Sequence, residues 1–149
     1  MTLETLKNNV SDKKVLIDTN IIIYLTDEIQ PCHPLSQELF TMIEQGKTKA
    51  VISILSISEV MQGPIKAGKA NLAFEVRDYL LNFPNSQCQP ITYDILEKIG
   101  NDDRVNWQAL RPIDSLIIAS GLYAEVDLFI SNDRHFIESL PKEMLFSFE

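Results

Sequence analysis

The sequence is poor in cysteine and glycine and has no long apolar run. Its two cysteines, Cys32 and Cys88, do not form a Cys-x-x-Cys pair, so a thiolate metal site has no support and we expect both to be reduced packing residues. Five glycines and seven prolines exclude a collagenous or disordered chain. Apolar runs such as 21–25 and 116–119 are far shorter than the roughly 20 residues that span a bilayer, so no membrane span is expected.

Basic residues are also scarce. The chain has 13 Lys and Arg against 21 Asp and Glu, a formal net charge of −8. That balance argues against broad electrostatic adhesion to nucleic acid, which basic proteins achieve by displacing counterions. It does not exclude nucleic acid as a substrate, because an acidic site filled with divalent cations adds to the negative count and still presents positive charge to a phosphate.

Two further absences narrow the function classes and the location. No glycine-rich phosphate loop and no Gly-x-Ser-x-Gly elbow is present, which removes support for nucleotide hydrolysis and esterase chemistry. Residues 1–12 are polar and carry both signs of charge, unlike the basic start and apolar middle of a secretory signal. We therefore expect a cytoplasmic protein, and the length of 149 residues predicts one domain over 1–149.

Apolar periodicity predicts alternating strands and helices. Helical patterns follow each of the first strand-like runs, and small residues near 119–124 suit a helix that lies close on a sheet. The expected strands are 15–17, 50–55, 89–92, 126–130 and an edge strand in 144–148, and the expected helices are 21–25, 35–43, 56–63, 72–83, 93–100, one from 111 onward and one ending near 140. This order indicates an α/β fold in which helices cover both faces of a central parallel sheet.

Four acids fall at strand ends or helix starts of this predicted fold: Asp18, Glu59, Asp114 and Asp133. The carboxyl ends of parallel strands form one edge of the sheet, where functional crevices lie. Converging carboxylates repel one another unless cations balance them. Because the ligands are hard oxygens, we expect Mg²⁺ or Mn²⁺, as one or two ions, in a site that hydrolyses phosphodiesters with metal-activated water.

Each acid has an assigned role in this hypothesis. Asp18 anchors the first metal, Asp114 and Asp133 complete the ligand shell, and Glu59 holds a water or orients the nucleophile. Asn20 and Ser131 are uncharged neighbours suited to holding waters or ligand carboxylates. Taken singly, the acids also suit ordinary helix capping; their joint occurrence in this order favours the catalytic reading.

Four segments resemble the PIN domain: Val15–Asn20, Ser56–Val60, Asp114–Ala119 and Ser131–Phe136. Within that family the length is similar to VapC-type ribonuclease toxins. The resemblance implies a Rossmann-like three-layer α/β/α fold, Mg²⁺- or Mn²⁺-dependent RNA cleavage, a homodimer and a small antitoxin partner. Relatives often carry threonine where Ser131 stands and a second alanine in place of Ser120–Gly121, and neither difference removes a ligand.

Three alternatives remain open. A catalytically silent PIN module would bind RNA or a protein, although it would have no reason to retain four repelling carboxylates. A stand-alone PIN nuclease would carry the same acids without an antitoxin. A receiver-type phosphoacceptor domain expects paired acids after the first strand and a lysine after the last, whereas this chain has Asp18 alone there and no lysine near Asp133.

Other residues carry weaker expectations. Arg111 and Arg134 flank proposed ligands and are candidates for RNA phosphate contacts. His135 is expected at a helix start without a catalytic duty, and His33 in a surface loop. The helical stripe over 72–83 is typical of ordinary core, and its aromatic residues Phe74 and Tyr79, on adjoining faces, also suit a dimer interface.

Overall fold

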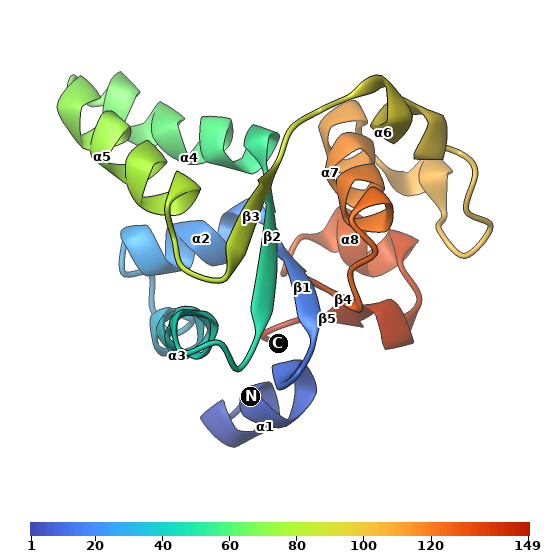
Figure 1. Ribbon diagram of the computed structural model, residues 1–149, viewed down its shortest axis with the longest axis horizontal. Helices are drawn as coiled ribbons and strands as arrows, with labels where there is room; N and C mark the ends of the chain where they lie inside the picture. Colours follow the sequence, from blue (N-terminus) through green and yellow to red (C-terminus); the bar gives the residue numbers. More distant parts are fainter.

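A computed structural model describes residues 1–149 and confirms the α/β class, with a five-stranded parallel sheet between two layers of helices (Figure 1). The helices α2 to α5 lie on one side of the sheet in this view and α6 to α8 on the other. The elements are α1 (Leu3–Val10), β1 (Lys14–Ile17), α2 (Thr19–Thr26), α3 (His33–Glu44), β2 (Lys49–Ser53), α4 (Ile54–Lys66), α5 (Ala70–Leu81), β3 (Ser86–Gln89), α6 (Tyr93–Lys98), η1 (Trp107–Ala109), α7 (Pro112–Tyr123), β4 (Leu128–Ile130), α8 (Arg134–Ser139), η2 (Lys142–Met144) and β5 (Leu145–Phe146). None of these helices combines the length and apolar character needed to cross a membrane.

The strand order is β3-β2-β1-β4-β5, so β1 lies at the centre of the sheet. Leu16 of β1 is in register with Val51 of β2 on one side and Phe129 of β4 on the other. Because all neighbouring strands are parallel, their carboxyl ends share one edge of the sheet. Segments that leave β1, β2 and β4 there are far apart in sequence and close in space.

Successive side chains of the central strands enter different cores. Val15 and Ile17 of β1 belong to the larger apolar cluster, formed with α1, α2, α3, α4 and α5. Leu16 points to the opposite face, into a smaller cluster with residues of α7 and α8. Period-two alternation with both faces buried explains why β1 reads as an uninterrupted apolar run and why helices must cover both sides.

Helix α7 lies against the sheet at Gly121. A Cβ built on Gly121 would overlap the ring of Phe129 and would lie 3.1 Å from Cδ1 of Leu16. The small residues of this helix therefore do what the sequence predicted: they permit a close approach of helix and sheet. This packing places the first turn of α7 at the carboxyl edge of the strands.

Three local features differ from the sequence prediction. Residues 3–10 form α1, in which Leu6 and Val10 are buried and the Thr2 side chain caps the start; two apolar residues one turn apart gave too weak a pattern to predict it. The strand expected at 89–92 lies at Ser86–Gln89, because pairing with β2 overrides the polar character of these residues.

The third difference concerns both ends of α4: residues 54 and 55, expected in the strand 50–55, form the start of the helix. The sequence predicts an end near Pro64, but the helix continues to Lys66. Proline removes one backbone donor, and the last turn persists because the amide of Ala67 still bonds to the carbonyl of Gly63 at 3.1 Å.

Candidate active site

The four predicted acids meet at one cavity of about 200 Å³ at the carboxyl edge of the sheet. They come from the start of α2, from α4, from α7 and from the start of α8. The cavity contains one basic side chain and no histidine or cysteine. Its lining residues are Asp18, Thr19, Asn20, Ile23, Glu59, Arg111, Asp114, Ile117 and Asp133.

Asp18 occupies the buried centre of the site, directly after β1, and is 5% exposed. It caps α2, with Oδ1 accepting from the amide of Thr19 at 2.8 Å. Oδ2 accepts from the Ser131 hydroxyl at 2.5 Å and from the Asn20 amide group at 3.3 Å. Both predicted supporting residues therefore contact the same carboxylate.

The pKa of Asp18 is raised from 3.8 to about 6. Burial is the largest cause, since it removes water from the charged form, and the negative charges of Asp133 and Glu59 add to it. Hydrogen bonds from Ser131 and Thr19 oppose the rise. A buried carboxylate that neighbouring carboxylates push toward protonation is a place where a cation would be favourable.

Asp114 is 4% exposed and is held by Arg111, three residues earlier. Nε of Arg111 donates to Oδ2 at 2.7 Å and Nη2 donates to Oδ1 at 3.1 Å. The Arg111 amide also donates to Oδ2 at 3.3 Å, which completes a capping box at the start of α7. The sequence placed Asp114 correctly but did not predict that a neighbouring arginine would engage both its oxygens.

Asp133 caps α8 and is partly buried. Its Oδ1 accepts from the amide of His135 at 2.7 Å and lies 3.0 Å from Nδ1 of that ring. Its Oδ2 accepts from Nη2 of Arg111 at 3.2 Å. The same guanidinium thus bridges Asp114 and Asp133, and His135, expected to have no role, touches a candidate ligand.

Glu59 is exposed and reaches the cavity from α4. Its Oε1 accepts from the hydroxyl of Thr19 at 2.8 Å, and the same Thr19 oxygen lies 2.9 Å from Oγ of Ser56. Sequence reasoning missed Thr19 as a site residue. Its place directly after Asp18, on the first turn of a helix that faces the crevice, was the available signal.

Arg134 and His33 lie outside the cavity lining. The Arg134 side chain is 86% exposed and pairs with Glu138 at 3.2 Å. His33 begins α3, with Nδ1 3.0 Å from the Tyr24 carbonyl oxygen. Of the two arginines proposed to contact RNA, only Arg111 lines the site.

The donor set can be tested for fit to a divalent cation. All charged donors are carboxylate oxygens, the ligands that Mg²⁺ and Mn²⁺ prefer. No three Asp, Glu, His or Cys side chains lie close enough to form a ready-made ligand group. Every carboxylate oxygen of the four acids except Oε2 of Glu59 accepts a hydrogen bond within the protein. The chemistry fits a hard cation, and Arg111 already places one positive charge against two of the acids.

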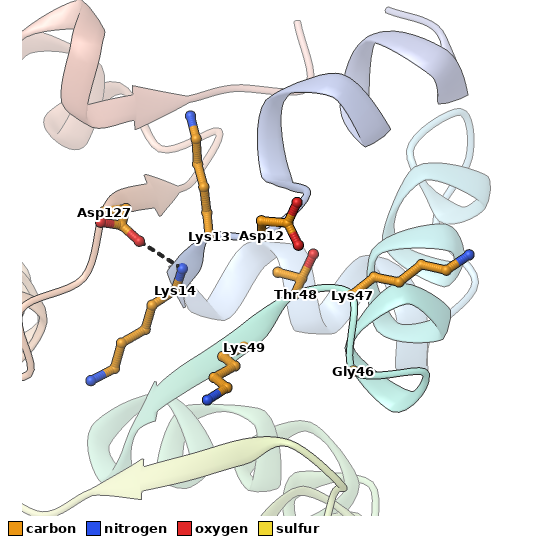
Figure 2. Close-up of a pocket in the computed structure, with 8 residues that line it drawn as sticks. All are labelled: Asp12, Lys13, Lys14, Gly46, Lys47, Thr48, Lys49 and Asp127. Atoms are coloured by element: carbon orange, nitrogen blue, oxygen red, sulfur yellow. Dashed lines mark hydrogen bonds between the residues drawn. The ribbon is translucent and has the colours of Figure 1, made fainter.

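A second charged hollow lies at the opposite end of the sheet, where β1 and β2 begin. It measures about 310 Å³ and is lined by four lysines and two aspartates among eight residues. Figure 2 shows the amino group of Lys13 pointing opposite to those of Lys14 and Lys49, and that of Lys47 pointing away from all three. These cations do not converge on one ligand position, so the hollow is not a competing active site.

The family model of the PIN domain matches residues 15–139, which include all four acids. No curated protein matches the chain significantly in sequence. The observed α/β architecture and the order of the four acidic segments agree with this family match.

Solved structures with the same fold include toxin–antitoxin proteins. VapBC2 from Rickettsia felis, bound to a promoter DNA fragment, has a TM-score of 0.68 at 15% identity, covering 91% of this chain and 99% of that chain. VapC20 from Mycobacterium tuberculosis, a sarcin–ricin loop cleaving toxin, has a TM-score of 0.62 at 14% identity over 83% and 93%. A toxin–antitoxin complex from Klebsiella pneumoniae has a TM-score of 0.61 at 19% identity over 89% and 95%. At such identities the likeness shows the fold.

Proposed function

This chain belongs to the PIN-domain family, and on that premise we propose that it is a divalent-metal-dependent endoribonuclease, the toxin of a toxin–antitoxin pair. The observation that carries the proposal is the convergence of four carboxylates from four separate segments on one cavity. Four carboxylates this close repel one another, and the repulsion lowers the stability of the fold unless a bound cation balances the charge.

We assign the metal to Asp18, Asp114 and Asp133, with Glu59 as a further ligand through water. When bound, Mg²⁺ or Mn²⁺ supplies an activated water and neutralises charge on the phosphodiester during in-line displacement. Asp18 fixes the buried side of the site, since three hydrogen bonds hold its oxygens. The proposal allows one ion or two, and the stoichiometry of a Mn²⁺ titration distinguishes them.

Glu59 and Thr19 handle the water in this proposal. The Thr19 hydroxyl holds Oε1 of Glu59 and leaves Oε2 without a partner in the protein. An oriented oxygen of an exposed carboxylate that lines the cavity is suited to accept a proton from an attacking water. Thr19 is then a positioning residue, because it acts through Glu59.

RNA would be held by basic groups at the rim. Arg111 lines the cavity and is 58% exposed, so its guanidinium has access to a phosphate. Arg134 is exposed directly after Asp133, at the start of α8, and is paired only with the exposed Glu138. An ion pair of this kind is weak in water and gives way readily to a phosphate.

Two protein partners are part of the proposal. A small antitoxin is supported by the toxin–antitoxin complexes that share this fold. A homodimer is supported by α5, where only Ala73 and Leu80 are buried while other large apolar residues are 43–48% exposed: Leu72, Phe74, Tyr79 and Leu81. Apolar surface concentrated on one helix is typical of an interface.

One observation favours the alternative of a silent binding module. Arg111 neutralises part of the acidic cluster by bridging Asp114 and Asp133, and a structural cluster would need such a counter-ion. The alternative predicts RNA or protein binding without cleavage. It also predicts that divalent cations leave the protein's stability unchanged.

The test is cleavage of a pool of structured RNAs by purified protein with Mg²⁺, with Mn²⁺ and with chelator. We expect cleavage that requires metal and is lost in Asp18→Asn and Asp114→Asn. Asp103→Asn, which lies outside the cavity lining, is the matched control and should cleave as the wild type does. Equal cleavage by wild type and Asp18→Asn would contradict the site assignment.

A further inference from the structure

Arg111 is the only basic side chain that lines the acidic cavity. Its guanidinium uses Nε and Nη2 on both oxygens of Asp114 and also reaches Oδ2 of Asp133 at 3.2 Å. The negative charges of Asp114, Asp133 and Glu59 all act to hold its proton and raise its pKa. The guanidinium therefore takes the position and the charge of a cation between two acids assigned as ligands.

A bidentate guanidinium and a divalent cation compete for the same two carboxylates, because each places positive charge against their oxygens. Arg–carboxylate forks engage both in-plane oxygens of the carboxylate, and Asp114 is only 4% exposed. Asp133 has Oδ1 engaged by His135 and Oδ2 by Arg111. A cation that binds both acids meets the positive charge of Arg111 against the same oxygens, and this repulsion favours release of the guanidinium from at least one of them.

The guanidinium of Arg111 has room to leave the two acids because the arginine side chain lies at the protein surface. Its side chain is 58% exposed, whereas that of Asp114 is 5% exposed. The carboxylate is thus fixed in the wall of the cavity, and the long flexible partner is the one able to leave toward solvent.

We propose that Arg111 is a built-in counter-ion that competes with the divalent cation for Asp114 and Asp133, so that metal binding and release of the guanidinium are one exchange. This inference rests on the proposed function. Because Arg111 competes for the acids, the protein should bind the divalent cation less tightly than the carboxylates alone would. The released guanidinium remains tethered at the mouth of the cavity, where it carries a positive charge available to a phosphate.

The experiment is calorimetric titration of Mn²⁺ into the metal-free protein, comparing wild type with Arg111→Gln and Arg111→Lys. We expect Arg111→Gln to bind Mn²⁺ about tenfold more tightly, since it removes the competing charge, an effect limited by solvent screening of the exposed arginine. Arg111→Lys keeps the charge but loses the planar fork, and should fall between the two.

Arg104→Gln is the matched control. Arg104 forms the same kind of fork, with Nε and Nη2 on Asp102 at 3.0 and 2.6 Å, and lies outside the cavity lining. It should bind Mn²⁺ as the wild type does. Thermal unfolding with and without Mn²⁺ checks folding: Mn²⁺ should raise the midpoint more for Arg111→Gln than for wild type, because the variant leaves a buried carboxylate without its partner.

A second readout follows the arginine itself. In ¹⁵N NMR spectra the Nε–H signal of Arg111 should be protected from exchange with water in the metal-free protein and should lose protection as diamagnetic Mg²⁺ is added. Equal Mn²⁺ affinity in wild type and Arg111→Gln, or an unchanged Nε–H signal in saturating Mg²⁺, would overturn the exchange while leaving the nuclease proposal standing. No Mn²⁺ binding by either protein would instead overturn the proposed metal site, and the exchange with it.

Discussion

The hydroxyl of Thr19 on α2 donates to Oε1 of Glu59 on α4 at 2.8 Å, across 40 positions of sequence. This bond links the helix that follows the central strand to the helix that follows its neighbour. It aims an otherwise exposed carboxylate at the cavity.

Thr19→Val should lower the rate of metal-dependent RNA cleavage by about 10- to 100-fold, since a misplaced catalytic group costs rates of this order. The substitution keeps the shape of the side chain and removes the donor. Thr19→Ser retains the hydroxyl and should restore most of the rate. Single-turnover cleavage measures both. Equal rates for wild type and Thr19→Val would show that Glu59 does not depend on this bond.

Asp18 makes the stability of the metal-free protein depend on pH. Its folded-state pKa of about 6 lies above the ordinary 3.8, so between about pH 4 and pH 6 the native state holds a proton that the unfolded state has lost. The free energy of unfolding therefore falls as the pH rises through this window. Above about pH 6 the whole of this loss in the free energy of unfolding is present.

Asp18→Asn removes this pH dependence. The metal-free variant should be more stable than wild type at pH 7.5 by up to about 3 kcal/mol, the free energy that corresponds to a pKa rise from 3.8 to about 6, and the difference should shrink toward zero below about pH 4. Urea unfolding in chelator at several pH values measures it. A difference that is independent of pH would show that the gain does not come from the Asp18 charge.

Ser131 joins two of the acids. Its hydroxyl donates to Asp18 at 2.5 Å and accepts from the amide of Asp133 at 3.0 Å, and the residue is fully buried. Ser131→Ala should lower the free energy of unfolding by about 1–3 kcal/mol, because it leaves the part-buried amide of Asp133 without its acceptor and removes the donor to the buried Asp18. Ser11→Ala, at an exposed hydroxyl bonded to the Lys7 carbonyl, should cost less than about 0.5 kcal/mol. Similar losses at both positions in urea unfolding would contradict the linking role.

Two glycines offer opposite predictions. A Cβ on Gly121 meets the Phe129 ring in the core, so Gly121→Ala should destabilise the protein by about 1–3 kcal/mol through overpacking. A Cβ on Gly63 of α4 meets nothing within 4 Å, so Gly63→Ala should stabilise it by about 0.5–1 kcal/mol. Thermal unfolding compares the pair. A stable Gly121→Ala would mean that α7 shifts away from β4 at little cost.

Local patterns in the sequence were sufficient for most of the fold. The run Val15–Ile17 predicted a strand buried on both faces, and the acid directly after it predicted the edge where helices begin. These features depend on residues that are close in the sequence, so the sequence alone is sufficient to predict them. Helix α1 and the register of β3 were not predicted, because Leu6 and Val10 become meaningful only when α3 and the sheet cover them, and Ser86–Gln89 only when β2 pairs with them.

By itself, the sequence determined which residue types stand at the carboxyl edge of the sheet: acids, with Asn20 and Ser131 beside them. Only the tertiary structure decided how these groups meet. Arg111 could face solvent, bind Asp114 alone, or bind Asp114 and Asp133 together. The position of α8 relative to α7 decides among these, because Asp133 is 22 positions from Arg111 in sequence. Long flexible side chains take their partners from charges that folding brings within a few ångströms, and that proximity is a property of the packed chain.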